Sequence, residues 1–169
     1  VERCGFSLAI SPHVPDGRAL TNICNYILDR IGQITKTHFG REALDRLEKQ
    51  VRNQCSFLDF TFREPYFPNQ TEPDQLADIY REMILCCHSN LSYDHSVRFA
   101  EAAFKQVFRQ VHWQAKTILD KYVLAGTPWE NRFRKEIAVD LKARRAMLNG
   151  ITMFQDLSTA QKKDRKSVV

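Results

Sequence analysis

Apolar residues recur every three or four positions along most of the chain, which is the period of an α-helix with one buried face. The first such stretch runs from the turn at Pro15–Gly17 to Gly40, and a second begins at Arg41. A third stretch starts at Asp74, a residue type that caps helices well, and ends at His88. The pattern therefore predicts three amphipathic helices in the N-terminal half of the chain.

The strongest helical pattern lies between residues 96 and 124. Its apolar stripe consists of Val97, Ala100, Phe104, Val107, Phe108, Val111, Ala115, Ile118 and Tyr122. Thr127, Pro128 and Glu130 then form the start signature of a fifth helix, which ends near Gly150. We expect an all-α domain of about five helices in a single helical bundle, with the helix near 96–124 as its long central element.

The segments outside these helices set the expected domain limits. Residues 1–155 form one helical domain that begins with an extended leader over 1–17, and residues 156–169 form a polar basic tail. The proline-rich loop before the third helix contains Tyr66 and Phe67. Such a pair either folds back on the core or anchors a partner, because aromatic residues are enriched at interfaces. Tyr66 and Phe67 are therefore the candidate residues for binding another protein.

Composition narrows the class of protein. Hydrophobic residues make up 43% and charged residues 27%, as in ordinary globular domains. No stretch approaches the roughly 20 apolar residues of a transmembrane helix. The five cysteines are an odd number without a CxxC pair, so we expect reduced thiols and an intracellular protein, cytoplasmic or nuclear. We expect no metal site and no cofactor, because spaced Cys and His pairs and glycine-rich phosphate loops are absent.

One pair of residues suggests catalysis. Arg81 and His88 are seven positions apart in the third helix and so lie within about 20° of the same face. An arginine, a short spacer and a histidine on one helix resemble the motif of HEPN-type ribonucleases, although the polar residue that often follows the arginine is here Glu82. The resemblance implies RNA cleavage with His88 as acid or base and Arg81 on the phosphate. The alternative is a solvated Arg81 and a His88 stabilised near a helix C-terminus.

A line of basic residues on the 96–124 helix suggests nucleic-acid binding. This basic stripe consists of Arg98, Lys105, Arg109, His112 and Lys116. The spacing places them within roughly 40° of one line, and Trp113 beside them could stack on a base. From Gly126 onward, ten basic and five acidic residues carry the chain's whole net charge of +5, with Arg134 and Arg145 among them. Acidic proteins or an anionic membrane surface would bind the same cations, and a solvated polar face is the simplest alternative.

These observations rank three functions. The first is a non-enzymatic interaction domain, acting as an adaptor, scaffold or regulatory module, excised from a larger intracellular protein and bound to another protein. The second is an RNA- or DNA-binding helical domain that uses the basic stripe, and the third is a HEPN-like ribonuclease. The long amphipathic helix could also close a homodimer. No residue is expected to be catalytic in the first two cases.

Overall fold

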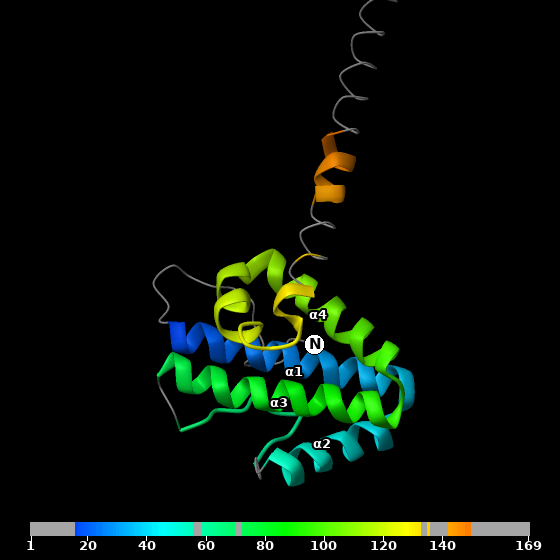
Figure 1. Ribbon diagram of the computed structural model, residues 1–169. Coiled ribbons are helices and arrows are strands. Elements are labelled where there is room, and N and C mark those ends of the chain that lie inside the picture. Colours follow the sequence, from blue (N-terminus) through cyan, green and yellow to red (C-terminus); the bar gives the residue numbers. More distant parts are fainter. Residues whose placement is uncertain (1–15, 56–58, 70–71, 133–134, 136–141, 150–169) are drawn as a thin grey trace, which may run out of the picture. The chain divides into compact units, whose positions relative to one another are not determined.

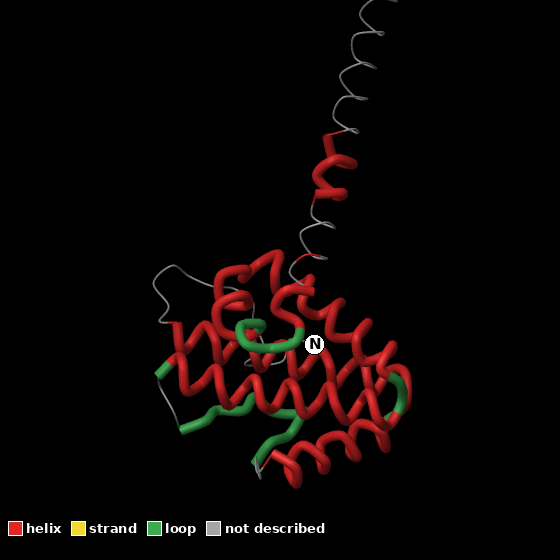
Figure 2. Tube along the Cα trace, in the orientation of Figure 1, coloured by secondary structure: helices red, strands yellow, loops and turns green. Residues whose placement is uncertain are grey.

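The computed structural model describes residues 16–55, 59–69, 72–132, 135 and 142–149. Within these ranges every regular element is helical and no strand occurs (Figures 1 and 2). The α-helices are α1 (Asp16–Phe39), α2 (Arg41–Cys55), α3 (Pro73–Asp94) and α4 (Val97–Ile118), and a π-helix, η1 (Leu119–Val123), follows α4 directly. Residues 129–132 and 142–149 are helical as well. The prediction of an all-α bundle is confirmed.

Contacts within the chain define two units, Val1–Glu130 and Asn131–Val169. The first unit contains α1 to α4 and η1. In the second unit, residues 142–149 form a helix whose side chains are all exposed. Asp16 of the predicted leader already belongs to α1, whereas the predicted tail over 156–169 lies outside the described residues.

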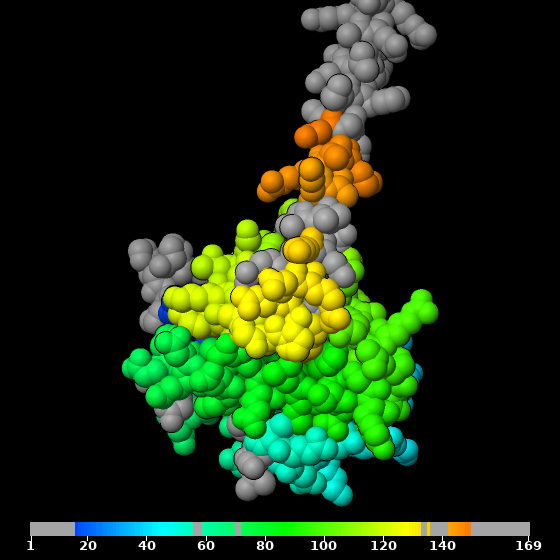
Figure 3. All heavy atoms as spheres, in the orientation of Figure 1, coloured from blue at the N-terminus to red at the C-terminus, as the bar shows by residue number. Residues whose placement is uncertain are grey.

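The core of the first unit lies around α1, which packs against α2, α3, α4 and η1. The space-filling view shows α2 alongside α3, whose other contacts are with α1, α4 and η1 (Figure 3). The largest fully buried side chains come from the four α-helices, the loop after α2 and the segment after η1: Leu20, Ile23, Ile27, Ile31, Leu47, Phe60, Tyr80, Met83, Phe104, Phe108 and Trp129. The α1 helix therefore shares the central position that the sequence assigned to the 96–124 helix.

The helical region predicted for residues 96–124 is interrupted near its end. Ser96 caps α4, because its side chain accepts a hydrogen bond from the Phe99 N–H at 3.0 Å. At Ala115 the backbone leaves the helical region, with φ −141° and ψ 45°, and the chain then continues as the π-helix η1. A 2.9 Å bond from the Leu124 N–H to the Leu119 carbonyl closes that wider turn.

The third helix is longer than its sequence pattern predicts. It ends at Asp94 and not at His88, and two polar side chains near its end bond within the helix. Asn90 Nδ2 donates to the Cys86 carbonyl at 2.8 Å, and Ser92 Oγ donates to the His88 carbonyl at 2.8 Å. Such bonds to the preceding turn let polar residues stay helical. At the other end Pro73 occupies the first turn, so the predicted cap at Asp74 is also wrong by two residues, the N-cap being Glu72.

The turn after η1 differs in detail from the predicted helix cap. Gly126 adopts φ 73°, which glycine tolerates, and its N–H donates to Glu130 Oε2 at 3.0 Å. The hydroxyl of Thr127 donates to the Leu124 carbonyl at 2.6 Å, so it closes the preceding turn and does not cap the next helix. Trp129, buried just beyond, stacks on Phe104 of α4 with ring centroids 5.4 Å apart. The turn is thereby attached to the core.

Candidate functional site

The C-terminal ends of α1 and α3 and the N-terminal end of α4 meet at one end of the first unit (Figure 1). The α1 helix stops at Phe39 because Gly40 adopts φ 87°, a left-handed conformation that favours glycine. The Gly40 N–H donates to the Lys36 carbonyl at 2.9 Å and closes the last turn. The chain then reverses into α2 at Arg41 and leaves the Phe39 ring at the tip of α1.

Four side chains from these helix ends form what we call the end cluster: His38, Phe39, His95 and Phe99. The Phe39 ring stacks on the His95 imidazole, with centroids 3.6 Å apart and an interplanar angle of 4°. The edge of Phe99 meets Phe39 at 4.7 Å and His38 at 5.3 Å. Because Ser96 caps α4 at the Phe99 N–H, it fixes the turn from which Phe99 projects. The end cluster is thus built from two helices and one turn.

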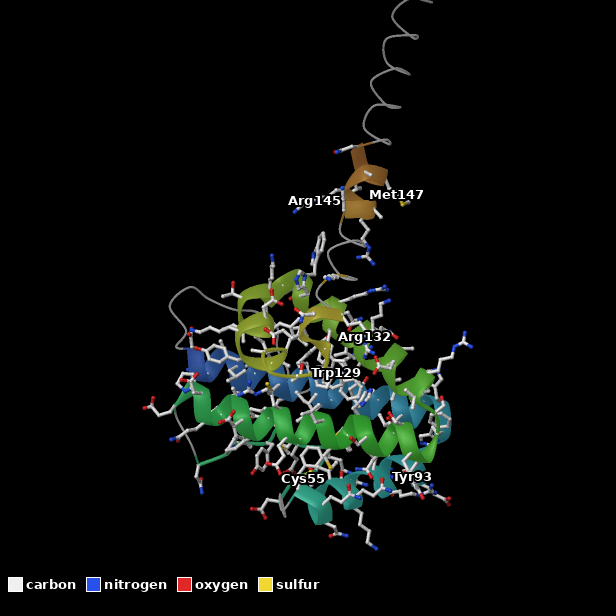
Figure 4. The ribbon with its side chains drawn as sticks, in the orientation of Figure 1. Cys55, Tyr93, Trp129, Arg132, Arg145 and Met147 are labelled. Carbon is white, nitrogen blue, oxygen red and sulfur yellow. The ribbon has the colours of Figure 1, made fainter. Side chains whose placement is uncertain are left out.

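Large apolar side chains are exposed at and beside the end cluster. Tyr93 is 90% exposed, Val97 62% and Phe39 41%. Figure 4 places Tyr93 at the end of α3, next to the start of α2. A single exposed apolar residue is ordinary, but several at one place mark a binding surface. Sequence analysis missed this surface because its members are separated in the chain and meet only in the folded unit.

The two residues predicted to bind a partner differ in their surroundings. Tyr66 is held against the core: its N–H donates to Asn25 Oδ1 at 2.7 Å, and its carbonyl accepts from Asn25 Nδ2 at 2.8 Å. The Tyr80 hydroxyl also donates to that carbonyl at 2.8 Å. Phe67, the next residue, is 66% exposed. Of the two aromatic residues, Tyr66 is therefore attached to the core and Phe67 faces solvent.

Arg81 and His88 each have a separate set of structural partners. Arg81 donates to the Ala125 carbonyl at 2.6 Å and pairs with Asp78 on its own helix. His88 Nε2 lies 3.0 Å from Glu101 Oε1, and the imidazole meets the Trp129 ring at 4.9 Å. These contacts fasten the η1 turn and α4 to α3. They do not bring the two side chains to a common partner, and the nuclease interpretation stays a prediction.

The basic stripe is not uniformly exposed. Arg98 and Lys116 near its two ends face solvent, whereas Lys105 and Arg109 are half-buried. His112 belongs to the core, with 6% of its surface exposed. The expected line of cations is therefore broken in the middle of α4.

The remaining nucleic-acid candidates are scattered. Trp113 is 65% exposed and lies two residues before the break at Ala115. Arg145 is exposed on the 142–149 helix of the second unit, where Figure 4 shows it on the opposite side of the helix from Met147. Arg134 lies outside the described residues. Trp113 and Arg145 therefore belong to different units of the chain, and their shared role in nucleic-acid binding stays a prediction.

A small pocket of about 90 Å³ lies between α1, α2 and the loop that follows α2. Its charged lining residues are Asp29, Lys36, Arg41, Asp45, Glu48 and Arg63. Three carboxylates face three cations, so the pocket has no net charge with which to attract an ion.

Cysteine chemistry in the described residues is that of reduced thiols. Cys24, Cys55 and Cys87 are buried, Cys86 is partly exposed, and none of the four forms a disulfide. Burial raises the pKa of the Cys24 and Cys87 thiols well above the usual value. Among the residues that the structure places, no group of three or more His, Cys, Asp or Glu side chains could hold a metal ion.

Comparisons of the chain with family models, curated proteins and solved structures found no match. Over the described part of the chain, no helix combines the length and the apolar character that a bilayer span requires. A function must therefore be argued from the side chains themselves.

Proposed function

We propose that the chain is a non-enzymatic interaction domain that binds a short segment of another protein at the end cluster. The observation that carries this proposal is the exposure of Phe39 within the stacked rings, together with that of Tyr93 and Val97, which stand two residues before His95 and Phe99 in the chain. Burying apolar surface contributes about 25 cal/mol per Å², and buried aromatic anchors dominate many interfaces. A partner that covers these side chains would gain most of its binding energy from them.

The size of the surface favours a short partner segment. A stable interface between folded proteins uses about 20–30 residues on each side. The end cluster, together with Tyr93 and Val97, offers only six. A second copy of the chain would therefore bury too little area here for a stable dimer, whereas a peptide with one or two anchor side chains fits the available surface.

The hydrogen-bond donors around the cluster favour an acidic segment, because imidazole N–H groups and a guanidinium can donate to a carboxylate. His38 and His95 belong to the cluster, and Arg98 is exposed on the first turn of α4. Between residues 93 and 99 the sequence contains one acidic residue, Asp94. The matching partner is a peptide in which a large apolar anchor stands next to a carboxylate.

A library of linear peptides displayed on phage, panned against the purified chain, tests the proposal. We expect the enriched peptides to share an aromatic or large aliphatic residue beside Asp or Glu. Substitution of Tyr93→Ala should weaken their binding about tenfold, which corresponds to about 1.4 kcal/mol. Arg98→Glu should weaken the binding of acidic peptides and leave the binding of neutral peptides unchanged, because it removes only the charge complementarity.

Phe67→Ala is the matched control, because it removes an exposed aromatic side chain from a different surface. It should leave the affinity for the selected peptides unchanged. The proposal is wrong if no peptide family is enriched, or if Tyr93→Ala and Val97→Ala bind like the wild type. Self-association of the wild type that is lost in Tyr93→Ala would identify a second copy as the occupant and would also overturn it.

A further inference from the structure

Three of the described cysteines gather where α2 meets α3. Cys55 is the last residue of α2 and is buried, and Figure 4 shows it on the side of α2 that faces α3. Cys86 and Cys87 lie in the middle of α3. The Cys86 thiol donates to Oε1 of Gln54, the neighbour of Cys55, at 3.8 Å. The neighbouring Cys86 side chain also helps to raise the pKa of the Cys55 thiol, as expected for two thiols that lie close together.

The two thiols have different surroundings. Cys86 is partly exposed, and the buried Asn90 side chain directs its Nδ2 at the Cys86 sulfur over 3.4 Å. The thiolate is the form of a cysteine that reacts, and a reactive thiol must also be accessible to the oxidant. For Cys55, burial raises the pKa of the thiol to about 12, and the neighbouring Cys86 side chain and the charge of Glu82 add to the rise. Cys86 is thus the residue that an oxidant reaches first, and Cys55 is the neighbouring thiol that can react with the oxidised Cys86.

We propose that Cys86 and Cys55 form a dithiol site that hydroperoxides oxidise to a disulfide. In the first step the Cys86 thiolate attacks a peroxide oxygen, a sulfur–oxygen bond forms, the oxygen–oxygen bond breaks, and water or an alcohol leaves after taking up a proton. In the second step the Cys55 sulfur attacks Cys86 Sγ and loses its proton to the departing hydroxide, which leaves as water. The peroxide is reduced by two electrons, and the two thiols are oxidised.

The other described cysteines are poor alternatives. Cys24 and Cys87 are fully buried and have no access to an oxidant in solution. Cys86 and Cys87 are consecutive helical residues, whose side chains point about 100° apart. A Cys55–Cys86 bond would instead tie the last residue of α2 to the middle of α3. This site is independent of the end cluster and of the function proposed for it.

Oxidation of the purified full chain by hydrogen peroxide, followed by alkylation and intact mass spectrometry, tests the site. We expect the wild type to lose two hydrogen atoms and two alkylation sites, and reducing agent to restore both. Trypsin cleaves on either side of the two cysteines, so the disulfide should join peptide 53–63 to peptide 82–98. Fragmentation of the joined peptides, together with the Cys87→Ala variant, assigns the bond to Cys86.

Single-cysteine variants decide between this site and its alternatives. In Cys55→Ser the oxidised Cys86 should stop at the sulfenic acid, which dimedone traps, whereas the matched control Cys24→Ser should still form the disulfide. The proposal is overturned if the disulfide contains Cys87 or Cys4. It is also overturned if wild-type Cys86 goes on to the sulfinic acid, or if peroxide leaves all thiols of the folded chain unchanged.

Discussion

His88 on α3 and Glu101 on α4 are paired, with 3.0 Å between His88 Nε2 and Glu101 Oε1. The imidazole also makes T-shaped contacts with two aromatic rings, with centroids 5.4 Å from Phe104 of α4 and 4.9 Å from Trp129. The same histidine that the sequence suggested as a catalyst therefore joins three segments of the chain. Its position is explained by packing, without a substrate.

Removal of this side chain should destabilise the fold. We expect His88→Ala to lower the free energy of unfolding by about 2 kcal/mol, because it opens a void against Trp129 and leaves Glu101 without this partner. Urea unfolding followed by Trp fluorescence measures the change. Ser89→Ala, an exposed neighbour on the same helix, is the control and should shift the free energy by less than about 0.5 kcal/mol. Equal stability of His88→Ala and the wild type would contradict the packing role.

The loop after α2 depends on one buried amide. Asn25 makes reciprocal hydrogen bonds with the backbone of Tyr66, as a neighbouring strand would. We expect Asn25→Ala to cost about 2–3 kcal/mol, because it leaves the Tyr66 N–H and carbonyl with fewer partners. Hydrogen exchange at the Tyr66 amide should accelerate more than exchange in α1. Asn69→Ala, at an exposed position of the same loop, should change neither quantity.

Much of the fold could be predicted from the sequence because its signals are local. Gly40 marks the end of α1, and the apolar period identifies every long helix. The errors occur where tertiary or side-chain contacts determine where a helix begins, ends or breaks. The end of α3 was missed because Asn90 and Ser92 bond inside the helix, and no proline or glycine announces the break at Ala115.

The candidate site was harder to predict for a related reason. Helical spacing places His112 on the same face as Arg98, but spacing does not say how far α4 is rotated into the core. The end cluster depends on how the ends of three helices meet, which no local pattern specifies. One signal was available: aromatic residues and histidines immediately before Gly40 and around the cap Ser96.

Gly32 lies in the middle of α1, where alanine would ordinarily stabilise a helix by about 1 kcal/mol. Here a Cβ atom would stand 2.9 Å from Cδ1 of the buried Phe62. We expect Gly32→Ala to lower stability by about 1 kcal/mol overall, since overpacking typically costs 1–3 kcal/mol. A double-mutant cycle with Phe62→Leu should recover most of the loss. A stabilising Gly32→Ala would show that the loop moves away freely.

Stability should fall in alkaline solution. Burial raises the pKa of the Cys24 thiol, so that thiol stays protonated in the folded state at pH values where it ionises in the unfolded state. The unfolded state then binds fewer protons than the folded state. The contribution of the Cys24 thiol to stability is fully present below about pH 8.5, and it declines by up to about 1.4 kcal/mol for each pH unit above that value.

Urea unfolding under reducing conditions at pH 8, 9 and 10 measures this slope. Cys24→Ala should make the free energy of unfolding depend less steeply on pH, by the amount that one thiol contributes. Val51→Ala, which truncates a buried side chain without a thiol, should lower stability at every pH and keep the wild-type slope. An unchanged slope in Cys24→Ala would contradict the assignment.

Charge reversal on α4 should separate the cations that support the fold from those that only face solvent. Lys105 and Arg109 are half-buried, and Arg109 Nε is shielded from water. We expect Lys105→Glu with Arg109→Glu to lower the melting temperature by several degrees, because buried charge of the wrong sign is costly. The matched variant Arg98→Glu with Lys116→Glu reverses two exposed charges and should melt like the wild type. Fluorescence anisotropy titrations of labelled RNA and DNA at several salt concentrations then test the basic stripe, and we expect no binding by the wild type. Salt-dependent binding that Arg98→Glu with Lys116→Glu abolishes without loss of stability would instead establish a nucleic-acid surface.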